Sequence, residues 1–168
     1  NIKKSLQTLD EDISREKGII IDANSNEKRL KEEKNDLIEI DSKYYETEKQ
    51  SNEDLDQSKS KLKNEIENIR TLISNKQNDE AINALDNFQS SIEKFAENFS
   101  KNQNIKKESV KRNERINIID KEIESWKNLL SNSEKMVNEL SERKGKLNIQ
   151  LDKLDNQPKL HAEKKGQI

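Results

Sequence analysis

The chain has 168 residues, of which 39% are charged and only 29% are hydrophobic, so it cannot fill the single compact core of an ordinary globular domain. Its 32 basic residues nearly balance its 34 acidic residues, whereas a disordered chain favours unbalanced charge. It has no cysteine, which excludes disulfides, thiolate metal sites and thiol catalysis. A long helix that buries one narrow stripe fits this composition.

Residues 1–76 are predicted to form the first helix of a coiled coil. Stepping by seven from Leu6 at position a and Leu9 at position d gives one frame that lasts ten heptads, to Leu72. Twelve of its twenty positions are apolar, against roughly six expected by chance at this composition. The pattern is weak between Lys34 and Ser51, so we expect a flexible stretch there.

A turn is predicted at residues 77–80, because residues 74–79 contain no apolar side chain and offer Asn78 or Asp79 as an N-cap. If the chain turns back near residue 77, residue i should face residue 154 − i. This pairing brings apolar positions together, as in Ile69 with Leu85, Leu62 with Ile92 and Leu55 with Phe99. The predicted fold is therefore an all-α, long antiparallel two-helix coiled-coil hairpin with no globular domain.

Residues 81–157 are predicted to form the second helix. Its apolar residues first follow the frame Ala81, Leu85, Phe88, Ile92, Phe95 and Phe99. The frame is expected to slip after Phe99 and to resume from Ile116 to Leu154. A partner-binding groove is an alternative interpretation of the phenylalanines with Ile92. Pro158 should end the helix, which leaves residues 158–168 as a polar tail.

Pairs of Glu with Lys or Arg four residues later mark the outer, solvated faces of both helices, among them Glu27 with Lys31, Glu39 with Lys43 and Glu108 with Arg112. No apolar run approaches the roughly 18 to 20 residues that span a bilayer, since the longest is Ile19-Ile20-Ile21. No signal peptide is visible either, and the chain does not start with Met, so we expect a soluble, cytoplasmic piece of a longer protein.

The sequence contains none of the common motifs for phosphate loops, dinucleotide binding, zinc proteases or serine hydrolases. His161 is the single histidine, and two packed helices do not enclose the deep pocket that acid and base chemistry needs. We therefore predict that the chain is not an enzyme and that it takes no cofactor, metal or small molecule.

Residues 101–115 hold six basic and two acidic residues. Such a surplus of positive charge can meet phosphates in a salt-sensitive manner that does not depend on base sequence. The candidate contacts to DNA phosphates are Lys101, Lys106, Lys107, Lys111, Arg112 and Arg115.

Two segments resemble the arms of bacterial structural maintenance of chromosomes (SMC) proteins. Residues 6–30, with a leucine, an acidic-isoleucine pair, Arg-Glu and a later Asp-Ala, resemble the amino-terminal arm. Residues 115–158, with a single Trp, an L-x-x-R spacing at Leu140 and Arg143 and a closing Pro, resemble the returning arm. The family's ATPase head motifs have no counterpart here, and the hinge domain expected between the arms is replaced by a few polar residues near Gln77.

The resemblance implies a non-catalytic rod within an SMC-type ATPase that acts in chromosome condensation and segregation. Its implied partners are a second copy of the chain, kleisin-type subunits and DNA, with no membrane, and its implied location is the cytoplasm at the nucleoid. Two other interpretations stay open. One is a structural or scaffold coiled coil of a phage, cytoskeletal or interaction protein, and the other is a direct nucleic-acid binder that works through residues 101–115.

Overall fold

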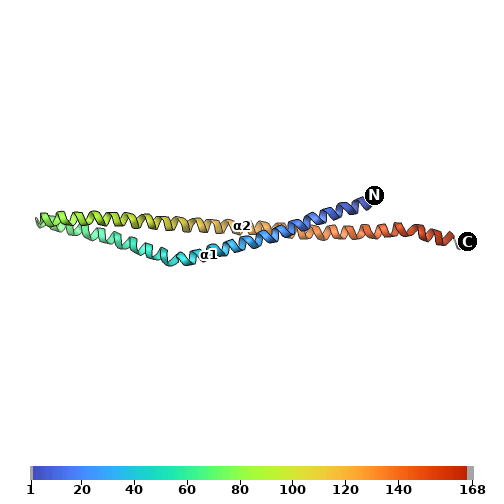
Figure 1. Cartoon of the computed structure of the whole chain (residues 1–168), viewed down its shortest axis with the longest axis horizontal. Coiled ribbons are helices and arrows are strands. Elements are labelled where there is room, and N and C mark those ends of the chain that lie inside the picture. Colours follow the sequence, from blue (N-terminus) through green and yellow to red (C-terminus); the bar gives the residue numbers. More distant parts are fainter. Residues whose placement is uncertain (1, 166–168) are drawn as a thin grey trace. The chain divides into compact units, whose positions relative to one another are not determined.

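The computed structural model describes the backbone of residues 2–165 and the side chains of residues 2–156. Helix α1 spans Ile2–Ser74 and helix α2 spans Asn78–Lys165 (Figure 1). The described residues contain no β-strand. The two helices pack antiparallel, which confirms the predicted all-α two-helix coiled-coil hairpin.

The register of the hairpin follows from polar contacts between the helices. They join Asp10 to Lys144, Asp41 to Arg112, Asn52 to Asn102, Ser58 to Asn98 and Glu65 to Ser91. In each pair the two residue numbers add to between 153 and 156. The pairing of residue i with residue 154 − i is therefore confirmed to within two residues.

The chain divides into two compact units, each of which contains part of both helices. Unit 1 joins Asn1–Glu33 to Ile119–Ile168 and has an apolar core in its described part. This core contains Ile13, Ala23, Leu30, Ile119, Ile123 and Leu140. The branched and aliphatic side chains at a and d exclude water from the contact between the helices, which is the main source of stability in a coiled coil.

Unit 2 is Lys34–Ile118 and has a more polar core. Its buried apolar residues are Ile69 and Ala81, close to the turn. Its buried polar residues are Ser51, Ser91 and Asn102, and Asn102 is fully buried. Unit 2 thus has fewer buried apolar side chains than unit 1 and has hydrogen-bonded polar side chains between its helices instead.

The predicted slip in the second helix is wrong. From Ala81 to Leu151, α2 keeps one heptad frame, and the buried or half-buried residues between 81 and 102 are Ala84, Phe88, Ser91, Phe95, Asn98 and Asn102. Leu85, Ile92 and Phe99, which were predicted to lie in the seam, are each more than 40% exposed. The reason is that an uninterrupted helix keeps the frame set by Ile116 to Leu151, since a slip would require local over- or underwinding.

The turn is shorter and earlier than predicted and occupies residues 75–77. The amide of Gln77 donates to the carbonyl of Leu72 at 2.9 Å, and that of Lys76 donates to the carbonyl of Ile73 at 3.0 Å. Lys76 has φ of 59°, so these bonds form a Schellman motif with lysine at the left-handed position. Gln77 accepts the first bond of α2 from Ala81, which makes Gln77 the N-cap in place of Asn78 or Asp79.

Pro158 does not end the second helix, contrary to prediction, because α2 continues to Lys165. Proline removes one backbone donor and crowds the carbonyl four residues earlier, which is a local penalty. The residues that follow it include Leu160, Ala162 and Glu163, which favour helix. Residues 166–168 of the predicted polar tail lie outside the described residues.

Candidate functional site

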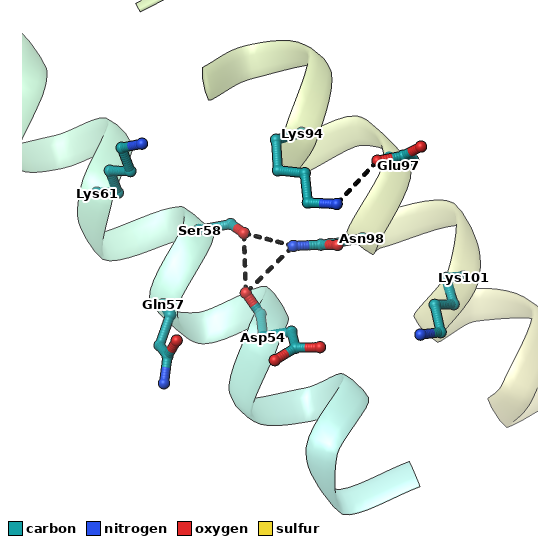
Figure 2. A pocket seen from close by; sticks show the side chains of 8 residues that line it. All are labelled: Asp54, Gln57, Ser58, Lys61, Lys94, Glu97, Asn98 and Lys101. Carbon is teal, nitrogen blue, oxygen red and sulfur yellow. Dashed lines mark hydrogen bonds and ion pairs between the residues drawn. The ribbon is translucent and has the colours of Figure 1, made fainter. Parts of the chain in front are cut away.

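A polar groove in unit 2 is a candidate site of the hairpin. It has a volume of about 620 Å³ and lies between the helices (Figure 2). Four of its residues are at position g of the heptad, two on each helix, and the others are at c and d. The lining residues are Asp54, Gln57, Ser58 and Lys61 of α1 and Lys94, Glu97, Asn98 and Lys101 of α2.

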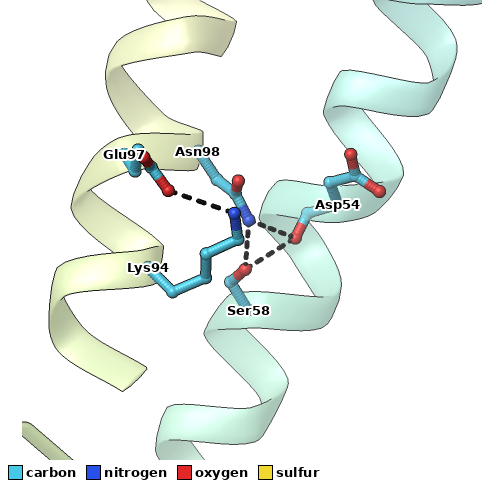
Figure 3. Close-up of polar contacts among 5 residues, drawn as sticks. All are labelled: Asp54, Ser58, Lys94, Glu97 and Asn98. Atoms are coloured by element: carbon cyan, nitrogen blue, oxygen red, sulfur yellow. Dashed lines mark hydrogen bonds and ion pairs between the residues drawn. The ribbon is translucent and has the colours of Figure 1, made fainter. Parts of the chain in front are cut away.

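A small hydrogen-bond network joins the two helices at this groove (Figure 3). The side-chain amide of Asn98 donates to Oγ of Ser58 at 2.6 Å and to the backbone carbonyl of Asp54 at 3.4 Å. The Ser58 hydroxyl donates to the same carbonyl at 2.8 Å. The Ser58 hydroxyl therefore donates its hydrogen bond to a backbone carbonyl, which is too weak a base to activate it as a nucleophile. The network instead joins the two helices through Asn98.

Two lysines of the groove pair with carboxylates on their own helices. Lys94 donates to Glu97 at 3.0 Å, and Lys61 lies 4.0 Å from Glu65. Lys101, the first of the candidate phosphate contacts, also lines this groove. Basic and acidic side chains alternate here, so the groove offers mixed charge to any ligand.

The seam next to this groove contains a second polar layer around Asn102. Its amide nitrogen donates to Oδ1 of Asn52 at 2.7 Å and to Oγ of Ser51 at 3.4 Å. Its own Oδ1 is buried without a hydrogen-bond partner, as is Oε2 of Glu65 in the layer formed with Ser91. A buried polar atom without a partner costs stability, so these two layers stabilise the hairpin less than apolar layers would.

Arg112 lies in the polar part of the seam, farther from the turn than Asn102. Its Nε donates to Oδ1 of Asp41, and its guanidinium lies 5.6 Å from the centre of the Tyr44 ring. The side chains of Arg112 and Asp41 are only 17% and 28% exposed. The pairing of residue i with residue 154 − i predicts Asn113 opposite Asp41, but Arg112 takes this place in the seam, and its planar guanidinium contacts both Asp41 and Tyr44.

The six candidate phosphate contacts are spread around α2. Lys101 and Arg115 are at position g, Lys106 is at e, Lys107 at f and Lys111 at c, whereas Arg112 is at d in the seam. Lys106 and Lys107 are exposed, and Lys111 donates to Glu108 at 2.8 Å. The structure therefore places them on several sides of the helix and brings no single face together from all six.

Two of the predicted pairs, Glu27 with Lys31 and Glu39 with Lys43, are confirmed, each at 2.7 Å. The predicted pair of Glu108 with Arg112 is wrong, because Glu108 forms its ion pair with Lys111. The hydrogen bond from Lys111, with the positive charge of the same side chain, lowers the pKa of Glu108. The hydrogen bond from Lys31 likewise lowers the pKa of Glu27. Both carboxylates are thereby held in their charged form. Glu108 lies on the outer face of α2, whereas the Glu27 side chain is 13% exposed at an a position, so the prediction that Glu27 marks an outer face is wrong.

The heptad frame of α1 correctly placed Ser51 and Ser58 in the seam, but sequence reasoning missed Ser91 and Asn98 of α2. Continuing the frame of Ile116 and Ile119 backward by sevens would have found the last two. Among the residues whose side chains are described, no group of three or more His, Cys, Asp and Glu is arranged to hold a metal ion. Neither described helix has a segment both long and apolar enough to cross a membrane.

Comparison with known protein families, with curated proteins and with solved structures found no match to this chain.

Proposed function

We propose that this chain is a non-catalytic coiled-coil spacer. The observation that carries the proposal is the constancy of pairing, because contacts as distant along the chain as Asp10 with Lys144 and Glu65 with Ser91 obey one register. The polar side chains in the seam are used to join the two helices. Such a hairpin sets a length and an orientation for whatever is attached to its ends.

The more specific form of the proposal is an arm of an SMC-type ATPase that acts in chromosome condensation and segregation, at the nucleoid, with kleisin-type subunits and DNA as partners. The packing of unit 1 supports it. Residues 6–30 and nearly all of residues 115–158, the two segments that resemble the outgoing and returning arms, belong to the same unit. Paired arms of this kind require those two segments to be neighbours.

The alternative is a structural or scaffold coiled coil unrelated to chromosomes. The turn favours this alternative, because residues 75–77 connect the helices directly where an SMC arm would carry a hinge domain. The sequence that surrounds this chain in its gene separates the two forms. An SMC arm requires a phosphate-loop motif upstream and an ATPase signature motif downstream.

A matched deletion tests the spacer itself. Residues 20–26 of α1 lie level with residues 128–134 of α2, so removing both heptads shortens unit 1 and keeps the frame and the register. We expect the doubly deleted chain to retain its helix content and cooperative unfolding by circular dichroism. The control lacks residues 20–26 alone, which shifts the register by seven residues, and it should be clearly less stable. Equal loss of structure in both variants would contradict a role based on length.

DNA binding is tested by fluorescence anisotropy with duplexes of two unrelated sequences. Replacing Lys101, Lys106, Lys107 and Lys111 with Gln should weaken any binding equally for both duplexes and should flatten its salt dependence by about one unit of slope per lost contact. Arg112 is left in place because it packs against α1. The control replaces four exposed lysines of unit 1, Lys121, Lys127, Lys135 and Lys146. Binding that responds equally to both sets would remove residues 101–115 as the DNA site.

A further inference from the structure

Six large apolar side chains remain exposed in the part of unit 2 closest to the turn. They are between 37% and 58% exposed, because the contact between α1 and α2 is formed by other residues, at positions a and d. Four belong to α2 and two to α1, and we call them the tip face: Ile66, Ile73, Ile82, Leu85, Ile92 and Phe99. All but Ile82, which is at b, are at position e, so they recur at the heptad spacing of a second seam.

The tip face lies on one side of the hairpin. In an antiparallel helix pair, the g residues of both helices flank one side of the seam and the e residues of both helices flank the other. The g residues Asp54, Lys61, Lys94 and Lys101 share the polar groove of Figure 2, so they mark the first side. The e residues of α1 and α2 therefore share the opposite side, and the contact of Asn52, at position e, with Asn102 agrees with this placement.

The two edges of the tip face carry opposite charge. Outward from the tip face, α2 carries Asp86 and Glu93 at position f and α1 carries Lys63 and Arg70 at position b, where the Arg70 guanidinium also contacts Glu67, at position f of α1, at 3.4 Å. In the register of the hairpin, Arg70 lies level with Asp86 and Lys63 lies level with Glu93. One apolar stripe is thus bordered by an acidic edge and a basic edge at matching heights.

We propose that the tip face is a dimerisation surface that packs against the same face of a second copy of this chain. The two-fold axis runs along the hairpin, so that both turns lie at the same end. This rotation sets α2 of one copy against α1 of the other, which brings Asp86 opposite Arg70 of the second copy and Glu93 opposite its Lys63. An axis across the hairpin would instead oppose acid to acid and base to base, which is unfavourable.

The resulting arrangement near the turns is a four-helix bundle. Each hairpin buries its a and d residues internally, and the e residues of both helices, with Ile82 at b, form the second contact. The phenylalanines Phe95 and Phe99 stack with ring centres 6.2 Å apart, so the half-buried seam and the exposed tip face are continuous at this point. The pairing concerns residues 63–99 and goes beyond the proposed spacer role, which it does not require.

The first test measures self-association of the full chain by sedimentation equilibrium. The variant Leu85→Glu with Ile92→Glu should weaken dimerisation at least tenfold, because it places four charges in the centre of the interface. The control carries Ile118→Glu with Met136→Glu, at positions that are 49% and 44% exposed against 48% and 44% for Leu85 and Ile92. The control should dimerise like the natural chain, and circular dichroism should show that both variants remain helical.

The second test concerns direction. The natural chain has no cysteine, so Asn75→Cys introduces one reactive group at the turn. With both turns at one end, a bismaleimide of about 10 Å reach, comparable to the spacing of packed helices, should link two copies, and Asp86→Lys with Glu93→Lys should abolish the link. A natural chain that stays monomeric, or a control that loses dimerisation as fully as the tip-face variant, would overturn the dimer. A dimer whose turns do not crosslink would overturn the proposed axis.

Discussion

Asn102 of α2 is fully buried, and its side-chain amide donates a hydrogen bond to Oδ1 of Asn52 on α1, 2.7 Å away. It sits at an a position opposite the buried Ser51 of α1. A buried asparagine at such a position lowers the stability of a coiled coil while favouring one alignment of its helices, because any other alignment leaves the amide without partners. The layers of Asn98 with Ser58 and of Ser91 with Glu65 repeat this device along unit 2.

The first prediction concerns this layer. Leucine has as many side-chain heavy atoms as asparagine, so the double variant Asn102→Leu with Ser51→Ala removes both polar groups with little change in volume. We expect it to raise the free energy of unfolding by about 1 to 3 kcal/mol, measured by urea denaturation. The single variant Ser51→Ala removes one acceptor from the buried amide and should be less stable than the double variant. A double variant that unfolds at lower urea than the natural chain would contradict this account.

The turn gives the second prediction. Lys76 holds a left-handed conformation that costs a residue with a Cβ roughly 1 to 2 kcal/mol and costs glycine little. Lys76→Gly should therefore stabilise the hairpin by about 1 kcal/mol in thermal or urea unfolding. The neighbouring variant Asn75→Gly serves as a control, because Asn75 is not among the residues with positive φ and glycine there adds only chain entropy. Equal effects of the two substitutions would exclude the conformational explanation.

Acid should weaken two ion pairs that form within single helices, Glu27 with Lys31 and Glu108 with Lys111. The pKa of Glu27 is lowered by the hydrogen bond from Lys31, and that of Glu108 by the hydrogen bond from Lys111, both from the ordinary value of 4.5. A carboxyl group whose folded-state pKa lies below its unfolded value stabilises the fold above the unfolded pKa and loses that contribution as the pH falls through the folded pKa. The midpoint of thermal unfolding should therefore fall below about pH 4.5.

The matched variant for this third prediction is Glu27→Gln with Glu108→Gln, which removes the two titrations and keeps the shape of the side chains. Its unfolding midpoint should vary less with pH between 5 and 3 than that of the natural chain. Because the ion pair of Glu108 with Lys111 is exposed and Lys31 of the other pair is more than half exposed, high salt should reduce the difference between the two proteins. A pH profile that is identical in both proteins at low salt would show that these carboxylates play no part.

Hydrogen exchange addresses the fourth prediction, which concerns the polar middle of the hairpin. Residues 34–52 and 100–114 carry polar seam positions that include Asp41, Ser51, Asn102 and Arg112. They should exchange together and faster than residues 55–72, 85–99 and 116–154, because less apolar burial opposes local opening. Uniform protection along both helices would argue against a flexible stretch, and fast exchange in only one of the two segments would argue against paired opening.

The course of α1 could be predicted from the sequence alone. All twenty a and d positions from Leu6 to Leu72 are buried or half-buried except Tyr44. The antiparallel register also followed from the sequence, because a turn near residue 77 determines which residues of the two helices lie opposite one another. These features are local or depend on a simple periodicity, so the order of residues suffices to determine them.

The seam of α2 near the turn was decided by the tertiary structure. Two overlapping stripes run along this helix, one through Ala84, Ser91 and Asn98 and one through Leu85, Ile92 and Phe99. The second stripe is the more hydrophobic of the two. A continuous helix that keeps one register along α1 can pack only the first stripe against α1, so the more hydrophobic stripe stays exposed. The position of the turn was likewise hidden, because a lysine and not a glycine takes the left-handed conformation, and tolerance of that strain depends on the two helices packed beneath it.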